Sequence, residues 1–175
     1  MAFTVQDDTG TVEDANAYIT VAAFIAYFAD RNITIAVDDD VNQAAIIRAT
    51  AYVDQRFCYK GSKLEGYDQT TQWPRQQSDY GGVYVGDDLV EGIPREVEQA
   101  TAEYAYRAYL DADGEVQPDP TVDANTKIKR DKLDVMETET EYFSHSTSLP
   151  NYPTADNILK RSGLTCSTQG FVGRA

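Results

Sequence analysis

The sequence predicts a mainly α fold: a small helical bundle with a β-hairpin and an extended C-terminal arm. Segments 44–61 and 93–109 are amphipathic at helical spacing and bracket a loop with the only tryptophan, and a strand-like period begins after residue 127. A hydrophobic content of 42% over 175 residues suits one compact domain with an appendage. We divide the chain into a helical body (1–110), an acidic linker (111–126), a β-hairpin (127–143) and an extended arm (144–175).

The first helix is expected within residues 15–31. Thr20 can cap it, because a threonine hydroxyl accepts a hydrogen bond from a backbone N–H group of the first turn. The apolar residues that follow repeat at the spacing of one buried helical face; they are Val21, Phe24, Ile25 and Phe28.

The second helix is expected from about residue 41 to residue 57, with Gly61 as its C-terminal breaker. Three aspartates at 38–40 precede it. Such a cluster could ligate a metal ion, but capping and the attraction of negative charge to a helix N-terminus explain it better. Apolar residues cover more than one face, which is typical of a central helix or of one that also faces a neighbouring subunit.

Residues 62–92 form a long connection with several glycines and no clear period. Connections of this length inside a domain are usually functional or form an interface. We expect Trp73 to pack over the helices; the alternative is a hot spot at a partner surface. Tyr80 and Tyr84, with the glycine pair after Tyr80, predict a short hairpin.

The third helix, 93–109, is the most clearly specified. Pro94 suits the first helical position, while Glu96 and Glu98 suit the first turn. Small residues recur at helical spacing along the rest of the segment, so another helix can approach closely. This pattern predicts bundling.

The acidic linker has two prolines and is interpreted as a helix stop and spacer. Its Asp-Ala-Asp-Gly-Glu run, 111–115, resembles the start of a calcium loop. An EF-hand, however, requires a bidentate glutamate at the twelfth position, where this chain has Val122.

The hairpin segment alternates glutamates with other residues between 136 and 142, which is the period of a strand. Opposite charges across paired strands stabilise a hairpin by roughly 0.2–1 kcal/mol each. A nucleic-acid patch is the alternative for the basic run, but the neighbouring glutamates favour pairing. The residues concerned are Lys127, Lys129, Arg130, Lys132, Glu137, Glu139 and Glu141.

The arm is rich in serine, threonine and proline, with a short helix expected at 156–161. Its apolar residues Leu164, Phe171 and Val172 lie in a segment that cannot bury itself well. Two interpretations stay open: the arm is disordered, or it is ordered by docking on a partner.

The net charge of −14 is unevenly distributed. Residues 1–126 hold 23 acidic and 8 basic side chains (−15), whereas residues 127–175 hold 6 and 7 (+1). Nucleic-acid binding usually depends on clustered lysine and arginine, so an acidic body disfavours it. The acidity could serve solubility, or it could line a passage through which DNA slides without sticking.

No catalytic, cofactor or metal constellation is visible. The only histidine, His145, lies in a Ser/Thr-rich segment without a nucleophile elbow, and no Walker A or GxGxxG motif occurs. Cys58 and Cys166 are far apart and are expected to be free thiols. Neither a secretory signal nor an apolar run of about 18 residues is present, so we expect a non-membrane protein that is made and used in a cytoplasm or in a particle assembled there. Because catalytic motifs are lacking, we expect no enzymatic activity.

Five segments in order resemble tailed-phage head–tail connector (adaptor) proteins, some of which carry the label DnaT-like single-stranded-DNA-binding protein. The segments are 12–31, 44–61, 72–75, 93–111 and 127–143. The resemblance implies a helical bundle in a ring, usually of twelve copies, in the virion neck. The ring would contact the portal protein and the next neck or tail protein, and double-stranded DNA would pass through it without specific binding.

The resemblance also implies roles for individual residues. Trp73, Pro74 and Arg75 would anchor a structural loop; Lys129, Arg130, Lys132, Glu137, Glu139 and Glu141 would form an inter-subunit hairpin; Leu164, Phe171, Val172 and Arg174 would form a portal-binding arm. Assembly would take place in the bacterial host cytoplasm. The alternatives are a single-stranded-DNA-binding protein and another neck or tail-completion protein.

Overall fold

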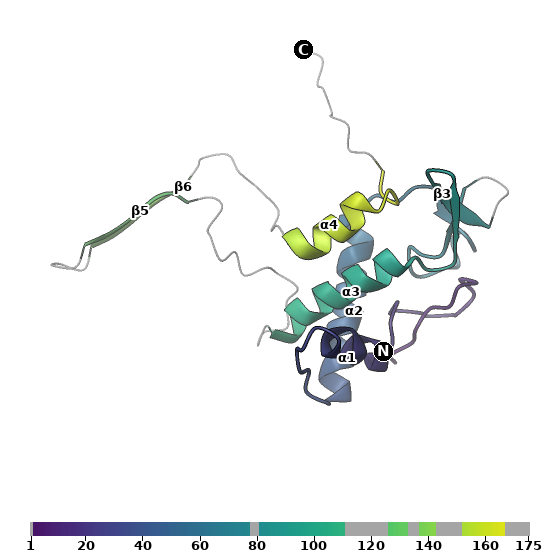
Figure 1. Ribbon diagram of the computed structural model, residues 1–175, viewed down its shortest axis with the longest axis horizontal. Helices are drawn as coiled ribbons and strands as arrows, with labels where there is room; N and C mark the ends of the chain where they lie inside the picture. Colours follow the sequence, from purple (N-terminus) through teal and green to yellow (C-terminus); the bar gives the residue numbers. More distant parts are fainter. Residues whose placement is uncertain (1, 78–80, 111–125, 133–136, 143–151, 167–175) are drawn as a thin grey trace, which may run out of the picture. The chain divides into compact units, whose positions relative to one another are not determined.

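A computed structural model describes residues 2–77, 81–110, 126–132, 137–142 and 152–166 of the chain. It divides the chain into two compact units. The first, the body, comprises Met1–Val116 with Pro153–Ala175, and the second comprises Gln117–Tyr152. Helices dominate the described residues, which confirms the prediction of a mainly α fold (Figure 1).

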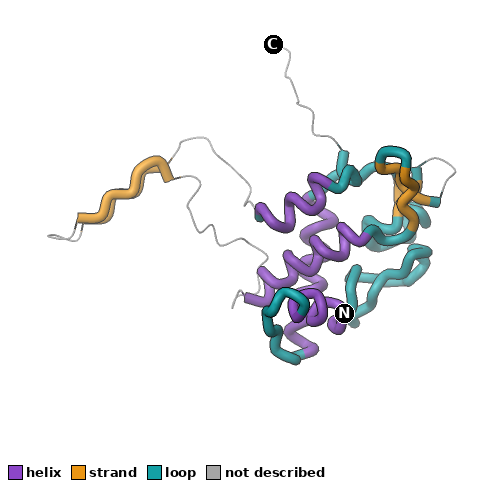
Figure 2. The backbone as a smooth tube through the Cα atoms, viewed as in Figure 1, coloured by secondary structure: helices purple, strands orange, loops and turns teal. Residues whose placement is uncertain are grey.

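Four helices build the body: α1 (Val21–Ala29), α2 (Asp39–Arg56), α3 (Arg95–Leu110) and α4 (Pro153–Arg161). α2 and α3 pack together, while α1 and α4 each contact α3 (Figures 1 and 2). The core between them is made of small and aromatic side chains, in keeping with the close approach that the alanines permit. Its wholly buried members include Phe24, Phe28, Ile46, Ala49, Val53, Val97, Ala100 and Tyr104.

The helix starts follow the predicted caps. The Thr20 hydroxyl accepts a hydrogen bond from the Ala23 nitrogen at 3.1 Å, and the Asp38 carboxylate accepts one from the Val41 nitrogen at 3.3 Å. The first aspartate of the run therefore caps α2. The other end of α2 differs from the prediction, because Phe57 is already extended (φ −111°) and Gly61 lies beyond it in a left-handed turn (φ +72°).

Two short antiparallel pairs complete the body. β1 (Ser62–Lys63) pairs with β2 (Arg75–Gln76), and β3 (Gly82–Val85) pairs with β4 (Asp88–Glu91). The predicted hairpin near Tyr84 is therefore confirmed, with its turn at 86–87. The pairing of β1 with β2 brings together the two ends of the segment that contains Trp73, residues 64–74, which we call the tryptophan loop.

The described residues of the second unit form an antiparallel pair, β5 (Thr126–Lys132) with β6 (Glu137–Tyr142). Its register sets Arg130 opposite Glu139 and Lys132 opposite Glu137, as the charge pattern predicted. Lys129 differs, since it lies opposite Thr140.

The C-terminal region departs from the predicted extended arm over residues 152–166. α4 begins three residues before the expected helix and packs against α3. Beyond it, Thr165 forms an antiparallel bridge with Tyr59, and Cys166 forms a disulfide with Cys58 (Cα–Cα 5.3 Å). The expectation of free thiols is therefore wrong, because the fold brings together two cysteines 108 positions apart.

Candidate functional site

Trp73 occupies the centre of the loop that precedes β2. Its side chain is wholly buried, and the ring of Tyr59 lies edge-on to it at 5.6 Å. The Trp73–Pro74 peptide bond is cis. Among the described residues the indole Nε1 has no hydrogen-bond partner, so packing holds this ring in place. A ring with no exposed surface is placed for packing rather than for a hot spot on the surface.

Arg75 is buried in the same loop, and its guanidinium binds backbone carbonyl groups. Nε donates to the Lys60 oxygen at 2.8 Å, and Nη2 donates to the Gly61 oxygen at 2.5 Å. A further bond from Nη1 reaches the Gln72 side chain at 2.7 Å. Arg75 therefore fastens the loop to the segment that follows α2.

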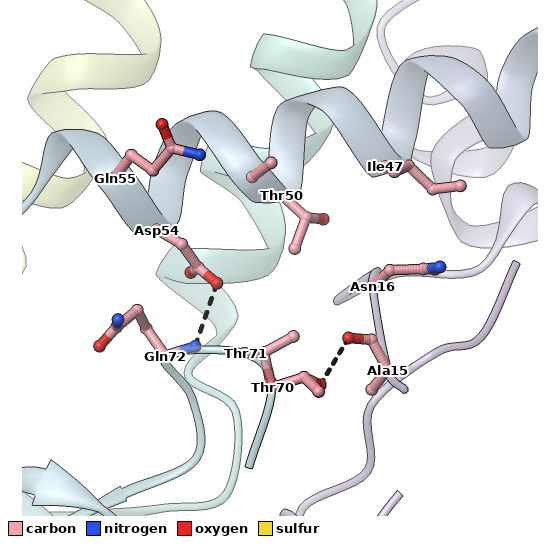
Figure 3. Close-up of a pocket in the computed structure, with 10 residues that line it drawn as sticks. Ala15, Asn16, Ile47, Thr50, Asp54, Gln55, Thr70, Thr71 and Gln72 are labelled. Carbon is pink, nitrogen blue, oxygen red and sulfur yellow. Dashed lines mark hydrogen bonds between the residues drawn. The ribbon is translucent and has the colours of Figure 1, made fainter. Parts of the chain in front are cut away.

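Asp54 of α2 holds the other side of the loop. Its Oδ1 accepts a hydrogen bond from the Tyr18 hydroxyl at 2.5 Å, and its Oδ2 accepts one from the Gln72 nitrogen at 3.0 Å (Figure 3). The Tyr18 oxygen in turn accepts hydrogen bonds from the nitrogens of Gln72 and Trp73. This Tyr18–Asp54 pair orients two successive peptide groups of the loop.

The carboxyl group of Asp54 is hard to ionise. Burial raises its pKa from 3.8 to about 6, although the bonds from Tyr18 and Gln72 favour the charged form. Within the described residues no cation lies within ion-pair distance of Asp54. Its charge is therefore held by dipoles rather than neutralised by a salt bridge.

Asp156 of α4 is a second carboxylate of the body, and unlike the half-buried Asp54 it is buried. Arg56 donates to it twice, from Nε to Oδ1 at 3.2 Å and from Nη2 to Oδ2 at 2.9 Å. The Tyr104 hydroxyl and the Lys160 ammonium group also donate to it. Burial opposes ionisation, but these bonds outweigh it and lower the pKa of Asp156. The cluster fastens α4 to α2 and α3.

Leu164 differs from its predicted role as an exposed portal-binding residue. Only 1% of its surface is exposed, because the segment after α4 folds back on the body and the Leu164 oxygen accepts a hydrogen bond from the Lys60 nitrogen. Phe171, Val172 and Arg174 lie outside the described residues. The hairpin residues listed above, Lys127 included, all lie in β5 or β6. Their side chains are likewise outside the description.

Most cations of residues 1–110 already have internal partners. This segment has 18 acidic and 8 basic residues, a net −10. Five of the eight basic side chains contact a protein oxygen or carboxylate: Arg31, Arg56, Lys63, Arg75 and Arg95. No group of three or more metal-ligating side chains occurs in the described residues, and no helix among them could cross a membrane.

The comparisons with known proteins give one match. The family model described as "Putative DnaT-like ssDNA binding protein" matches residues 1–175. The chain belongs to this family. No curated protein and no solved structure matches it.

The roles of Asp54 and Asp156 in this family member were not identified from its sequence. Asp54 and Asp156 are two among 29 acidic residues, and their partners Tyr18 and Arg56 lie 36 and 100 positions away. One local signal existed: each lies within a helix next to apolar residues, where a carboxylate needs a partner. Local spacing does not reveal which partner that is.

Proposed function

We propose that the chain is a structural head–tail adaptor of a tailed phage. In this proposal, copies of the chain, twelve by the resemblance, form a ring beneath the portal protein, continue the DNA channel and link the capsid to the tail without enzymatic activity. The charge distribution is the observation that carries the proposal. Five of the eight cations in residues 1–110 have partners among the described residues, and this segment carries ten more acidic than basic side chains, so the body would repel rather than collect phosphate.

Attachment is assigned to elements outside the body's core. Antiparallel β5–β6 has charges of both signs in register, and a two-stranded pair leaves both edges available for a neighbouring copy. Phe171, Val172 and Arg174 keep their proposed role at the portal, while Leu164 loses it. Weak contacts repeated by ring symmetry add to a tight joint.

A symmetric cryo-EM reconstruction of the neck of the phage that encodes this chain tests the proposal. We expect density for the helical body directly below the portal. Density one layer further down would support another neck or tail-completion protein instead. Absence of the chain from purified virions would contradict a virion role altogether.

Single-stranded-DNA binding is the second candidate, because the family description names it. Such proteins combine a positive groove with aromatic side chains on which bases stack. Tyr67 is fully exposed here, but its sequence neighbours include Glu65 and Asp68. Tight, salt-sensitive binding of an oligonucleotide by the purified chain would favour this candidate over the adaptor.

A further inference from the structure

A pocket of about 390 Å³ opens beside the tryptophan loop, between α2, the segment before α1 and the loop residues 70–72 (Figure 3). This volume lies in the range of ligand sites, roughly 300–1,000 Å³. Ile47 and Ala51 of α2 give it an apolar wall, while Thr50 and Asp54 supply polar groups. The pocket contains none of the residues assigned to attachment above.

Thr50 is the feature that points to a ligand. The residue is 2% exposed, yet its hydroxyl has no hydrogen-bond partner among the described residues. A buried hydroxyl without a partner costs free energy, and such groups call for an explanation. In Figure 3 its side chain leaves α2 on the same side as that of Asp54, one helical turn away, and faces the pocket.

Asp54 supplies the complementary charge. Each of its oxygens accepts one hydrogen bond from the protein, and a carboxylate has about four acceptor sites. Lys63 and Arg75 are the nearby cations that favour its charged form, but both donate to backbone oxygens instead. A negative charge with open acceptor sites thus lies at the wall of a half-apolar pocket.

We propose that this pocket binds a guanidinium group, held by Asp54 and by the hydroxyl of Thr50. A guanidinium is planar, carries five N–H donors and is weakly hydrated, so it can bind a carboxylate and a hydroxyl at once beside apolar side chains. Positions i and i+4 on a helix place these two acceptors about 5–6 Å apart at Cβ. A compact ammonium group reaches one of them more easily than both. The inference does not depend on the proposed adaptor role.

Two sources can supply this group: a free arginine-containing ligand and an arginine of a second copy of the chain. The test uses ¹⁵N-labelled full-length protein and N-acetyl-arginine methylamide as the probe, with the citrulline analogue as a neutral control of the same shape. The reporters are the backbone amides of Gln72 and Trp73, because both donate hydrogen bonds into the Tyr18–Asp54 pair.

We expect saturable shifts of these amides with the arginine probe, with a dissociation constant on the order of 1–10 mM, and none with citrulline. Thr50→Val keeps the shape and breaks no internal hydrogen bond, and it should weaken binding about three- to tenfold; Thr50→Ser should restore it. Asp54→Asn should weaken it at least about tenfold. A second copy as the source would instead appear as shifts that vanish on dilution and that the free probe reproduces.

Equal shifts with arginine and citrulline would overturn the proposal, since charge would not be recognised. The proposal would also be overturned if the amides shifted neither on addition of the arginine probe nor on dilution of the protein. If Asp54→Asn fails to fold, Thr50→Val decides: unchanged affinity in that variant removes the hydroxyl from the site and contradicts the proposal.

Discussion

Asp54 and Asp156 are two carboxylates that each fasten a separate segment to the same helical frame, and they do so in different ways. Asp156 receives hydrogen bonds from two cations and a tyrosine, and its pKa is lowered. Among the described residues, the donors to Asp54 are neutral groups only, and burial raises its pKa to about 6. The first charge is fully matched inside the protein, and the second is not.

Asp156 is therefore a structural latch, whereas Asp54 lies on a surface that can still bind a partner. Asp156 holds α4 in place, because moving α4 away would leave two partners on other helices, Arg56 and Tyr104, without their carboxylate. Asp54 holds the loop of Trp73 and keeps open acceptor sites toward a pocket. We therefore interpret α4 as part of the structural scaffold, and the side of α2 that carries Asp54 as the binding surface.

The largest expected effect concerns the tryptophan of the loop. Trp73→Ala should lower the free energy of unfolding by about 3–5 kcal/mol, because it removes a wholly buried ring and leaves a cavity. Trp73→Phe is the matched control and should cost clearly less, since Nε1 has no partner among the described residues to lose. Urea unfolding measures both. Equal, small losses in both variants would mean that the ring is not part of the core.

The disulfide should give the next effect. Reduction, or Cys58→Ser, should lower the free energy of unfolding by about 2–4 kcal/mol, because the bond closes a long loop between α2 and the segment after α4. Thiol titration of the denatured, unreduced protein should find no free thiol. The double variant Cys58→Ser/Cys166→Ser should be insensitive to reductant. Two free thiols in fresh protein would restore the expectation drawn from the sequence.

Removal of the Asp156 latch should lower the free energy of unfolding slightly less than loss of the disulfide does. Asp156→Ala should destabilise the body by about 2–3 kcal/mol, because it leaves Arg56 and Tyr104 without their carboxylate, although the lysine can turn to water. Asp156→Asn keeps the shape of the side chain, and its free energy of unfolding should lie between those of the wild type and Asp156→Ala. Hydrogen exchange should show the loss first in α4. A uniform loss across all helices would contradict a local latch.

The smallest effect is a pH dependence assigned to Asp54. Its folded pKa, about 6, is raised above the unfolded value of 3.8, so the folded state binds the proton more tightly and loses stability as pH rises through this window. Between pH 5 and pH 7 the wild type should lose on the order of 1 kcal/mol relative to Asp54→Asn. Denaturation at both pH values measures it. A wild type that gains stability over this range relative to the variant would contradict the assignment.

Much of the frame could be predicted because its signals are local. Thr20 and Asp38 cap helices through residues three positions away, and Pro94 precedes α3. The position of the β3–β4 hairpin followed from glycines and aromatic residues in one short stretch. Such features depend on periodicity and turn chemistry that a single sequence contains.

The remaining features depend on contacts between distant segments. No local sequence pattern predicts that Cys58 and Cys166 lie side by side, or that Arg56 neutralises Asp156. Leu164 was misassigned for the same reason, since its burial depends on how the segment after α4 folds back. The pocket is a property of three segments that no periodicity connects.

The most direct test of the account is the affinity of the purified chain for single-stranded DNA as salt is varied. Fluorescence anisotropy with a labelled poly-dT oligonucleotide measures it, because stacking and phosphate contacts both contribute to such binding. We expect no saturable binding even at low salt, since most cations of the body are engaged internally and its net charge is negative. Tight binding that weakens steeply with salt would contradict it and favour a single-stranded-DNA-binding protein.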